Sequence, residues 1–219
     1  MRVLVACEES QAVTIELRKL GHEAYSCDIL DCSGGHPEWH IRGNVGAELK
    51  KKWDMIIAFP PCTYLSNAGA CRLYPRKGVI DTGRFAKGLE AKKFFMQILD
   101  SPCKKIAIEN PVSSLVFKMP KHSQEVQPYE HGHPFTKKTR LWLKGLPELA
   151  PSDIVKPEGP YIPAGTGRKD RSKYGAAKRS GGDSLNRSKT FPGIAKAMAL
   201  QWAGDIRSKQ FQFDPGFGA

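Results

Sequence analysis

Hydrophobic and polar positions follow two alternating patterns along the chain. Short apolar runs bounded by turn residues predict strands, and apolar residues at helical spacing predict helices between them. We expect strands at 2–7, 23–28, 53–59, 104–108 and 139–144, and helices at 11–20, 85–99 and 191–202. Ser10 is expected to cap the first helix and Gly21 to end it. This alternation predicts an α/β fold with a doubly wound, mostly parallel sheet.

The segment 147–189 breaks this pattern, because it carries several prolines and glycines and little periodic apolar signal. Residues 166–189 contain eight Lys or Arg and two Asp, so the net charge of this segment is half of the chain's +12. Two interpretations stay open: a solvated loop, or an arm that contacts the phosphates of a nucleic acid. The residues that would make such contacts are Arg168, Lys169, Arg171 and Lys173.

The length of 219 residues suits one α/β domain with a full core. We divide it into a core (1–146), a basic Pro/Gly-rich insertion (147–189), a C-terminal helix that returns to the core (190–204) and a loose tail (205–219). The positive charge and the pI of about 9.5 favour a polyanionic partner, most simply nucleic acid. Six scattered cysteines indicate reduced thiols in a cytoplasm, and the sequence shows neither an apolar run long enough for a membrane span nor a signal peptide.

Chemically useful side chains follow several of the expected strands. Cys7-Glu8-Glu9-Ser10 follows the first, Asp28 ends the second, and Cys62 stands behind two prolines after the third. Glu109-Asn110-Pro111 ends a later one. Because the carboxyl ends of parallel strands meet at one edge, we expect these groups to converge there.

The types of these residues suggest a ligand and a reaction. An acid such as Asp28 at the end of the second strand can bind a ribose diol, but the first loop lacks the glycines of a pyrophosphate cradle. A ligand with a ribose and no phosphate therefore fits better. A thiol and a carboxyl that face each other could attack and protonate an electron-poor ring.

In order and type, these motifs resemble those of DNA cytosine-5 methyltransferases. Phe59-Pro60-Pro61-Cys62 is similar to the nucleophile loop of that family, and Glu109-Asn110-Pro111 is similar to its Glu-Asn-Val motif. Thr136-Lys137-Lys138-Thr139-Arg140 resembles the family's basic motif, and Gly43-Asn44-Val45 its adenine-contacting segment. The last helix, entered through residues 189–195, is similar to the final motif.

The resemblance is closer to the short members encoded by phages and prophages. The opening Ala6-Cys7-Glu8-Glu9-Ser10 and the stretch 141–147 support it, and the similarity spans about residues 1–204. It implies a Rossmann-like, S-adenosylmethionine-dependent methyltransferase fold. The small basic insertion would stand in place of a target-recognition domain. A phage-encoded member would act in the cytoplasm of a bacterial host.

The resemblance also implies roles for individual residues. Cys62 would add to C6 of cytosine, Glu109 would hold N3 and the exocyclic amine, and Arg140 would orient the base or a phosphate. The implied contacts to S-adenosylmethionine come from Cys7, Glu8, Ser10, Asp28, Asn44, Phe59 and Pro60. Besides the basic arm, the implied substrate contacts come from Pro61, Ser66, Asn110, Pro111 and Lys138. The substrate would be duplex or single-stranded DNA, and a duplex would have to flip its cytosine out.

The chain also departs from the family pattern. The first motif has no glycine run, Asn44 replaces an acid, and Lys138 replaces an arginine. Only about 40 residues are available for target recognition, so short or relaxed sequence specificity is expected. Two alternatives remain: the same chemistry on a free pyrimidine nucleotide, or a nucleic-acid-binding relative without catalysis.

The spacing of Cys27, Cys32, His36 and His40 is similar to that of zinc ligands. However, Asp28 lies between them with a role of its own in the methyltransferase interpretation, and His36 lies in an irregular loop. We therefore expect no metal site.

Overall fold

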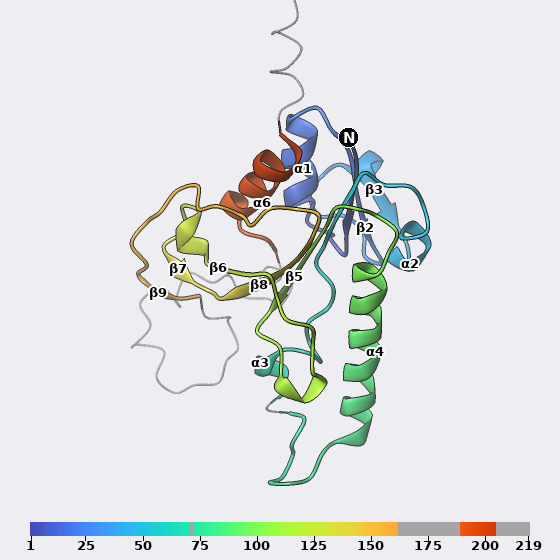
Figure 1. Cartoon of the computed structure of the whole chain (residues 1–219), viewed down its shortest axis with the longest axis vertical. Coiled ribbons are helices and arrows are strands. Elements are labelled where there is room, and N and C mark those ends of the chain that lie inside the picture. The colour runs from blue at the N-terminus through green and yellow to red at the C-terminus, as the bar shows by residue number, and fades with distance from the viewer. Residues whose placement is uncertain (71, 162–188, 205–219) are drawn as a thin grey trace, which may run out of the picture.

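A seven-stranded sheet forms the centre of the computed structural model, which describes residues 1–70, 72–161 and 189–204 (Figure 1). The strand order is β3-β2-β1-β4-β5-β8-β6. The strands are β1 (Arg2–Ala6), β2 (Glu23–Asp28), β3 (His40–Arg42), β4 (Met55–Ala58), β5 (Ile106–Pro111), β6 (Gln124–Val126) and β8 (Thr139–Lys144). Neighbours from β3 to β5 are parallel, and β8 runs antiparallel to both β5 and β6. The predicted α/β, doubly wound, mostly parallel fold is confirmed.

Helices cover both faces of this sheet. One face carries α1 (Ala12–Lys19) and α6 (Pro192–Met198), which continues as a π-helical turn, η5 (Ala199–Ala203). The other face carries α2 (Val45–Glu48) and the long helix α4 (Thr82–Leu99). The short helix α3 (Asn67–Ala70) follows the loop after β4, and 3-10 turns lie at η1 (Pro37–Trp39), η2 (Leu115–Phe117) and η3 (Pro128–Glu130).

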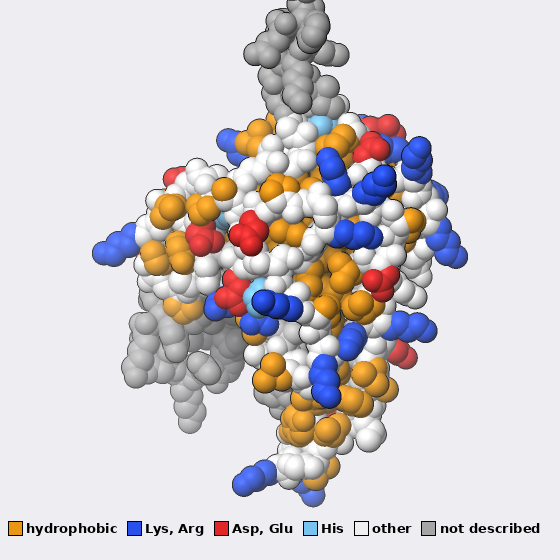
Figure 2. Space-filling view, in the orientation of Figure 1, with side chains coloured by type: hydrophobic (Ala, Val, Ile, Leu, Met, Phe, Trp, Pro, Cys, Tyr) orange, Lys and Arg blue, Asp and Glu red, His pale blue; other side chains and the backbone are white. Residues whose placement is uncertain are grey.

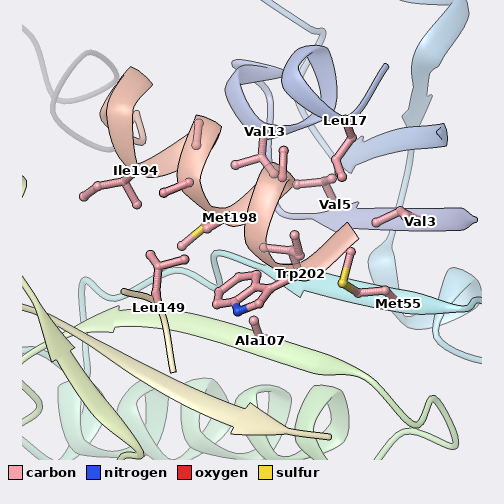
Figure 3. Packing of buried hydrophobic residues seen from close by; sticks show 14 of the residues in the cluster. Val3, Val5, Val13, Leu17, Met55, Ala107, Leu149, Ile194, Met198 and Trp202 are labelled. Atoms are coloured by element: carbon pink, nitrogen blue, oxygen red, sulfur yellow. The ribbon is translucent and has the colours of Figure 1, made fainter. Parts of the chain in front are cut away.

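The hydrophobic cores on the two faces of the sheet follow from the alternation of side chains along each strand. Val3 and Val5 of β1 face α1 and α6, whereas Leu4 and Ala6 face the α4 side. Figure 3 shows Trp202 and Met198, from the last helical segment, directed toward Leu149 and the sheet. The central strands β1 and β4 are apolar on both faces because helices cover both.

Several predicted boundaries change in the structure. Helix α4 begins at Thr82 rather than Phe85, because Asp81 Oδ1 accepts a hydrogen bond from Arg84 N at 2.8 Å and caps it. Strands β3 and β6 were not predicted, since three residues are too few to show a period.

The start of the insertion is more regular than its composition suggested. Strand β9 (Gly159–Pro160) pairs in parallel with β7 (Phe135–Thr136), and Tyr161 N donates to Thr136 O at 2.9 Å. His131 and Asp153 form an isolated bridge. Residues 152–161 therefore lie against 129–136. Residues 162–188, with the predicted phosphate contacts Arg168, Lys169, Arg171 and Lys173, lie outside the described residues.

Within the described ranges, no helix combines the length and the apolar character needed to cross a membrane.

Candidate active site

The thiol of Cys62 lies on a tight turn at the carboxyl end of β4. Phe59 N donates to Ala6 O at 2.9 Å, which extends the β4–β1 pairing by one residue. Pro60 is buried, Pro61 is exposed and Cys62 is half-buried. Leu65 N and Ser66 N both donate to Cys62 O, at 3.0 and 2.9 Å, and thereby hold the turn closed.

The same turn is fixed to the end of β5. Asn110 is fully buried, and its Nδ2 donates to Pro60 O at 3.1 Å. Ser66 forms an isolated bridge with Ser113, and Ser114 N donates to Leu65 O at 2.7 Å. The structure therefore brings the Pro-Pro-Cys loop and the Glu-Asn-Pro segment together, although they are far apart in the sequence.

Basic and aromatic side chains flank this loop on the α4 side. Arg84 Nη2 donates to Thr63 O at 3.2 Å, and its guanidinium lies 5.0 Å from the centre of the Tyr64 ring. Lys87 lies 5.7 Å from the same ring, at a hollow of about 400 Å³ that Pro61 and Tyr64 also line. Figure 2 shows Lys and Arg side chains distributed over the viewed face of the molecule, with hydrophobic side chains gathered in its lower part. A polyanionic strand could thus approach the loop from this side.

Glu109 lies on β5 and is paired in register with Leu141 of β8. The surrounding protein desolvates its carboxyl, and this raises its pKa above the usual value although the residue is only half-buried. Two weaker effects oppose that rise: the positive charge of Lys137 and a hydrogen bond from the Thr139 side chain. Desolvation therefore makes this carboxyl harder to ionise than an exposed glutamate.

The ends of β1 and β2 form the remaining edge of the site. Asp28 is half-buried, and its Oδ1 accepts from Leu30 N at 3.0 Å. Ile29, the next residue, is 72% exposed. Cys7 adopts a left-handed backbone with φ 59°, and burial together with the charge of Asp28 raises the pKa of its thiol. Cys7 is therefore a neutral thiol beside Asp28.

Two of the predicted cofactor contacts, Glu8 and Asn44, have hydrogen-bond partners within the chain. The carboxylate of Glu8 accepts from Val13 N at 2.7 Å, Thr14 N at 3.3 Å and Thr14 Oγ1 at 2.8 Å, so Glu8 caps α1. The prediction that Ser10 caps this helix is wrong. The residue next to the helix is Gln11, and its side chain is hydrogen-bonded to the backbone of His36. Asn44 Oδ1 accepts from Gly46 N at 2.8 Å and caps α2.

The residues at this edge fit the ligand that the resemblance implies. Asp28 retains a carboxylate oxygen for a ribose diol, and Ile29 offers an apolar surface to a purine ring. Apart from the buried Glu8, the loop 7–11 contains one acid, Glu9, and no Lys or Arg, which suits a positively charged ligand and disfavours phosphates.

The basic motif is divided between two sides of the sheet. Arg140 Nε lies 3.1 Å from Glu125 Oε1, and Lys138 Nζ lies 2.7 Å from Glu125 Oε2. Pro111 pairs in register with Thr139, and Asn110 with Arg140. The structure does not bring Arg140 to Glu109. Sequence reasoning missed Glu125, Lys137 and Thr139, although the alternation along 139–144 could have indicated which side chains share a face.

The zinc-like spacing is not assembled into a metal site. Cys27 is buried with its thiol toward Gly43 O at 3.8 Å, and His40 lies between Ser26 Oγ at 2.8 Å and Leu30 O at 2.9 Å. In the part of the chain that is described, no group of three or more His, Cys, Asp or Glu is placed to hold a metal ion.

Comparison with known proteins finds distant structural similarity. The chain matches no protein-family model and no curated protein sequence. A solved structure described as a DNA modification methyltransferase encoded within a prophage (E. coli) is 12% identical, with 70% of this chain and 51% of that chain covered and a TM-score of 0.42. Entamoeba histolytica methyltransferase EhMeth is 13% identical, with coverages of 70% and 57% and a TM-score of 0.40. A Spodoptera frugiperda DNMT2 mutant is 17% identical, with coverages of 71% and 57% and a TM-score of 0.38. The chain thus spans between 51% and 57% of the lengths of these three chains.

Proposed function

We propose that this protein transfers a methyl group from S-adenosylmethionine to C5 of cytosine in DNA, with Cys62 as the nucleophile. The observation that carries the proposal is the hydrogen bond from Asn110 Nδ2 to Pro60 O at 3.1 Å. It ties the thiol loop to the segment that holds a desolvated carboxyl, Glu109. Attack on an electron-poor ring requires a nucleophile and an acid, and here these two groups lie at the ends of two strands.

The first step is addition of the Cys62 thiolate to C6 of the ring. The Sγ–C6 bond forms, and the electron pair of the C5–C6 double bond moves toward C5, N3 and the C2 carbonyl. Glu109, protonated in its desolvated site, donates a hydrogen bond to N3 and accepts one from the exocyclic amine. The negative charge that develops on the ring is thereby offset, and C5 becomes nucleophilic.

When bound, S-adenosylmethionine supplies an electrophilic methyl group to C5. Asp28 would hold its ribose and Ile29 its adenine, at the edge formed by β1 and β2. Afterwards a base takes the C5 proton, the C5–C6 double bond forms again, and the Sγ–C6 bond breaks to release the Cys62 thiolate. The atoms and charges of the thiol are restored at the end of the cycle.

DNA is the proposed substrate because the chain carries a net charge of +12 and basic side chains flank the Cys62 loop. A paired cytosine would have to leave the duplex to reach the thiol. With only about 40 residues between 147 and 189, we propose short or relaxed sequence specificity.

Methyl transfer and adduct formation test this proposal. Labelled S-adenosylmethionine is incubated with duplex DNA, single-stranded DNA and dCMP in parallel, and DNA containing 5-fluorocytosine is used to trap the covalent adduct. We expect transfer to DNA, an adduct with the wild type and none with Cys62→Ser. Transfer to dCMP alone would exclude DNA as the substrate, and an adduct that survives Cys62→Ser would exclude the nucleophile. Cys32→Ser, at another half-buried cysteine, is the matched control and should leave the adduct unchanged.

A further inference from the structure

The pairing of β8 determines which side chains of the basic motif can reach the acid of the site. Glu109 is opposite Leu141, whereas Arg140 is opposite Asn110 on one side and Glu125 on the other. Residues opposite each other in an antiparallel pair point to the same face, and consecutive residues point to opposite faces. Arg140 and Glu109 therefore lie on opposite faces of the sheet.

Glu125 engages the two cations that the family resemblance favoured. It lies 2.7 Å from Lys138 Nζ and 3.1 Å from Arg140 Nε, and His122 Nε2 lies 3.6 Å from the same carboxylate. The hydrogen bond from Lys138, followed by that from Arg140, holds the pKa of Glu125 below its usual value. Lys138 and Arg140 thus form an ion-pair network on the side of the sheet that faces away from Glu109.

Lys137 and Thr139 alternate with Lys138 and Arg140 along the chain, so they lie on the same face of the sheet as Glu109. The Thr139 side chain is hydrogen-bonded to the Glu109 carboxyl, and Thr139 is almost fully buried. Lys137 Nζ lies 5.5 Å from the centre of the Phe191 ring and 5.7 Å from that of Tyr161. Its backbone N donates to Gln127 Oε1 at 2.9 Å, which fixes the chain where it enters β8.

The aromatic rings give the Lys137 ammonium a defined place beside the acid. Tyr161 and Phe191 pack edge to face with centroids 5.1 Å apart, and Phe135 lies 5.4 Å from Tyr161. Cation–π contacts of this kind orient an ammonium group. The charge of Lys137 reaches the Glu109 carboxyl, where it opposes the effect of burial.

We propose that Lys137 is the cation that contacts the substrate at this site, donating to the C2 carbonyl oxygen of the cytosine that Glu109 holds, and that Thr139 is a positioning residue that orients Glu109. This inference rests on the proposed function. Addition of the thiolate to C6 places negative charge on N3 and on the C2 oxygen, so an acid and an ammonium on the same face stabilise it together. Arg140 and Lys138 remain with Glu125.

Three matched substitutions test the assignment: Lys137→Gln, Lys138→Gln and Arg140→Gln. We expect Lys137→Gln to lower kcat by about 100-fold, as loss of one preorganised donor does. Lys138→Gln and Arg140→Gln should leave kcat near the wild-type value, because their side chains are on the opposite face. Lys137→Arg keeps the charge and should restore part of the activity. If Arg140→Gln abolishes turnover while Lys137→Gln retains it, the assignment is wrong.

The ionisation of Glu109 gives a second readout that does not depend on methyl transfer. Carboxyl carbon resonances of the folded, isotope-labelled protein are followed against pH, with Glu109→Gln used to assign the signal. Removing the positive charge of Lys137 should raise the pKa of Glu109 further, whereas Lys138→Gln and Arg140→Gln should not. An unchanged Glu109 titration in Lys137→Gln would refute the placement of Lys137. Absence of the 5-fluorocytosine adduct in the wild type would instead refute the proposed function, and with it the substrate contact assigned to Lys137.

Discussion

Replacing Glu8 with Gln should change how the stability of this protein depends on pH. Glu8 is buried, and its carboxylate caps α1 through Val13 and Thr14. Burial raises its pKa from 4.5 to about 7, against the hydrogen bonds that favour the charged form. Between these two values the native state binds more protons than the unfolded state. The free energy of unfolding therefore decreases as pH rises through this window.

The size of the effect follows from the shift. A change of one pKa unit corresponds to about 1.4 kcal/mol, so the shift of Glu8 corresponds to about 3 kcal/mol lost between pH 4.5 and 8. Gln has the same shape and does not ionise. The difference in unfolding free energy, Glu8→Gln minus wild type, should therefore increase by about this amount over the same window.

Urea denaturation at a series of pH values measures this difference. Burial lowers the pKa values of His131 and His133, but both residues are present in both proteins, so their contributions to the difference cancel. Glu16→Gln, at the ion pair of Glu16 with Lys19, is the matched acid-to-amide control on the same helix. A difference that is independent of pH would refute the reasoning. Because Glu8 points to α1, the dissociation constant for S-adenosylmethionine should not change in Glu8→Gln.

Three further predictions follow from single contacts. Gly88→Ala places a Cβ against the Phe117 ring and should destabilise the fold by about 1–3 kcal/mol in denaturant titrations. Gly83→Ala should not destabilise it, because the nearest atom to the added Cβ would be Asp81 Oδ1 at 3.5 Å. Asn110→Ala removes the hydrogen bond to Pro60 O, so it should lower the free energy of unfolding by about 1–3 kcal/mol and slow formation of the 5-fluorocytosine adduct. Asn67→Ala, at an exposed position, should change neither quantity. Arg84→Gln combined with Lys87→Gln should weaken DNA binding and reduce the slope of log affinity against log salt by about 2, while Lys52→Gln on the exposed loop before β4 should leave that slope unchanged.

Local patterns in the sequence determined most of the fold. Apolar runs and helical spacing predicted β1, β2, β4, β5, β8, α1, α4 and α6, because burial against a neighbouring layer imposes these periods on the chain itself. The order of strands and helices also placed Cys62 and Glu109 at one edge of a parallel sheet. The ends of elements were less accurate, since caps such as Glu8 and Asp81 lie outside the periodic segments.

Only the tertiary structure decided how neighbouring polar side chains are divided between faces. Lys137, Lys138, Thr139 and Arg140 are adjacent in sequence, and a register shift of one residue would exchange the two sets completely. The pairing of β8 with β5 and β6 sets that register: it directs Arg140 to Glu125 and leaves Thr139 with Glu109. The sequence by itself determined which chemical groups this protein carries and in what order. Strand pairing, a contact between distant segments, decided which of those groups meet.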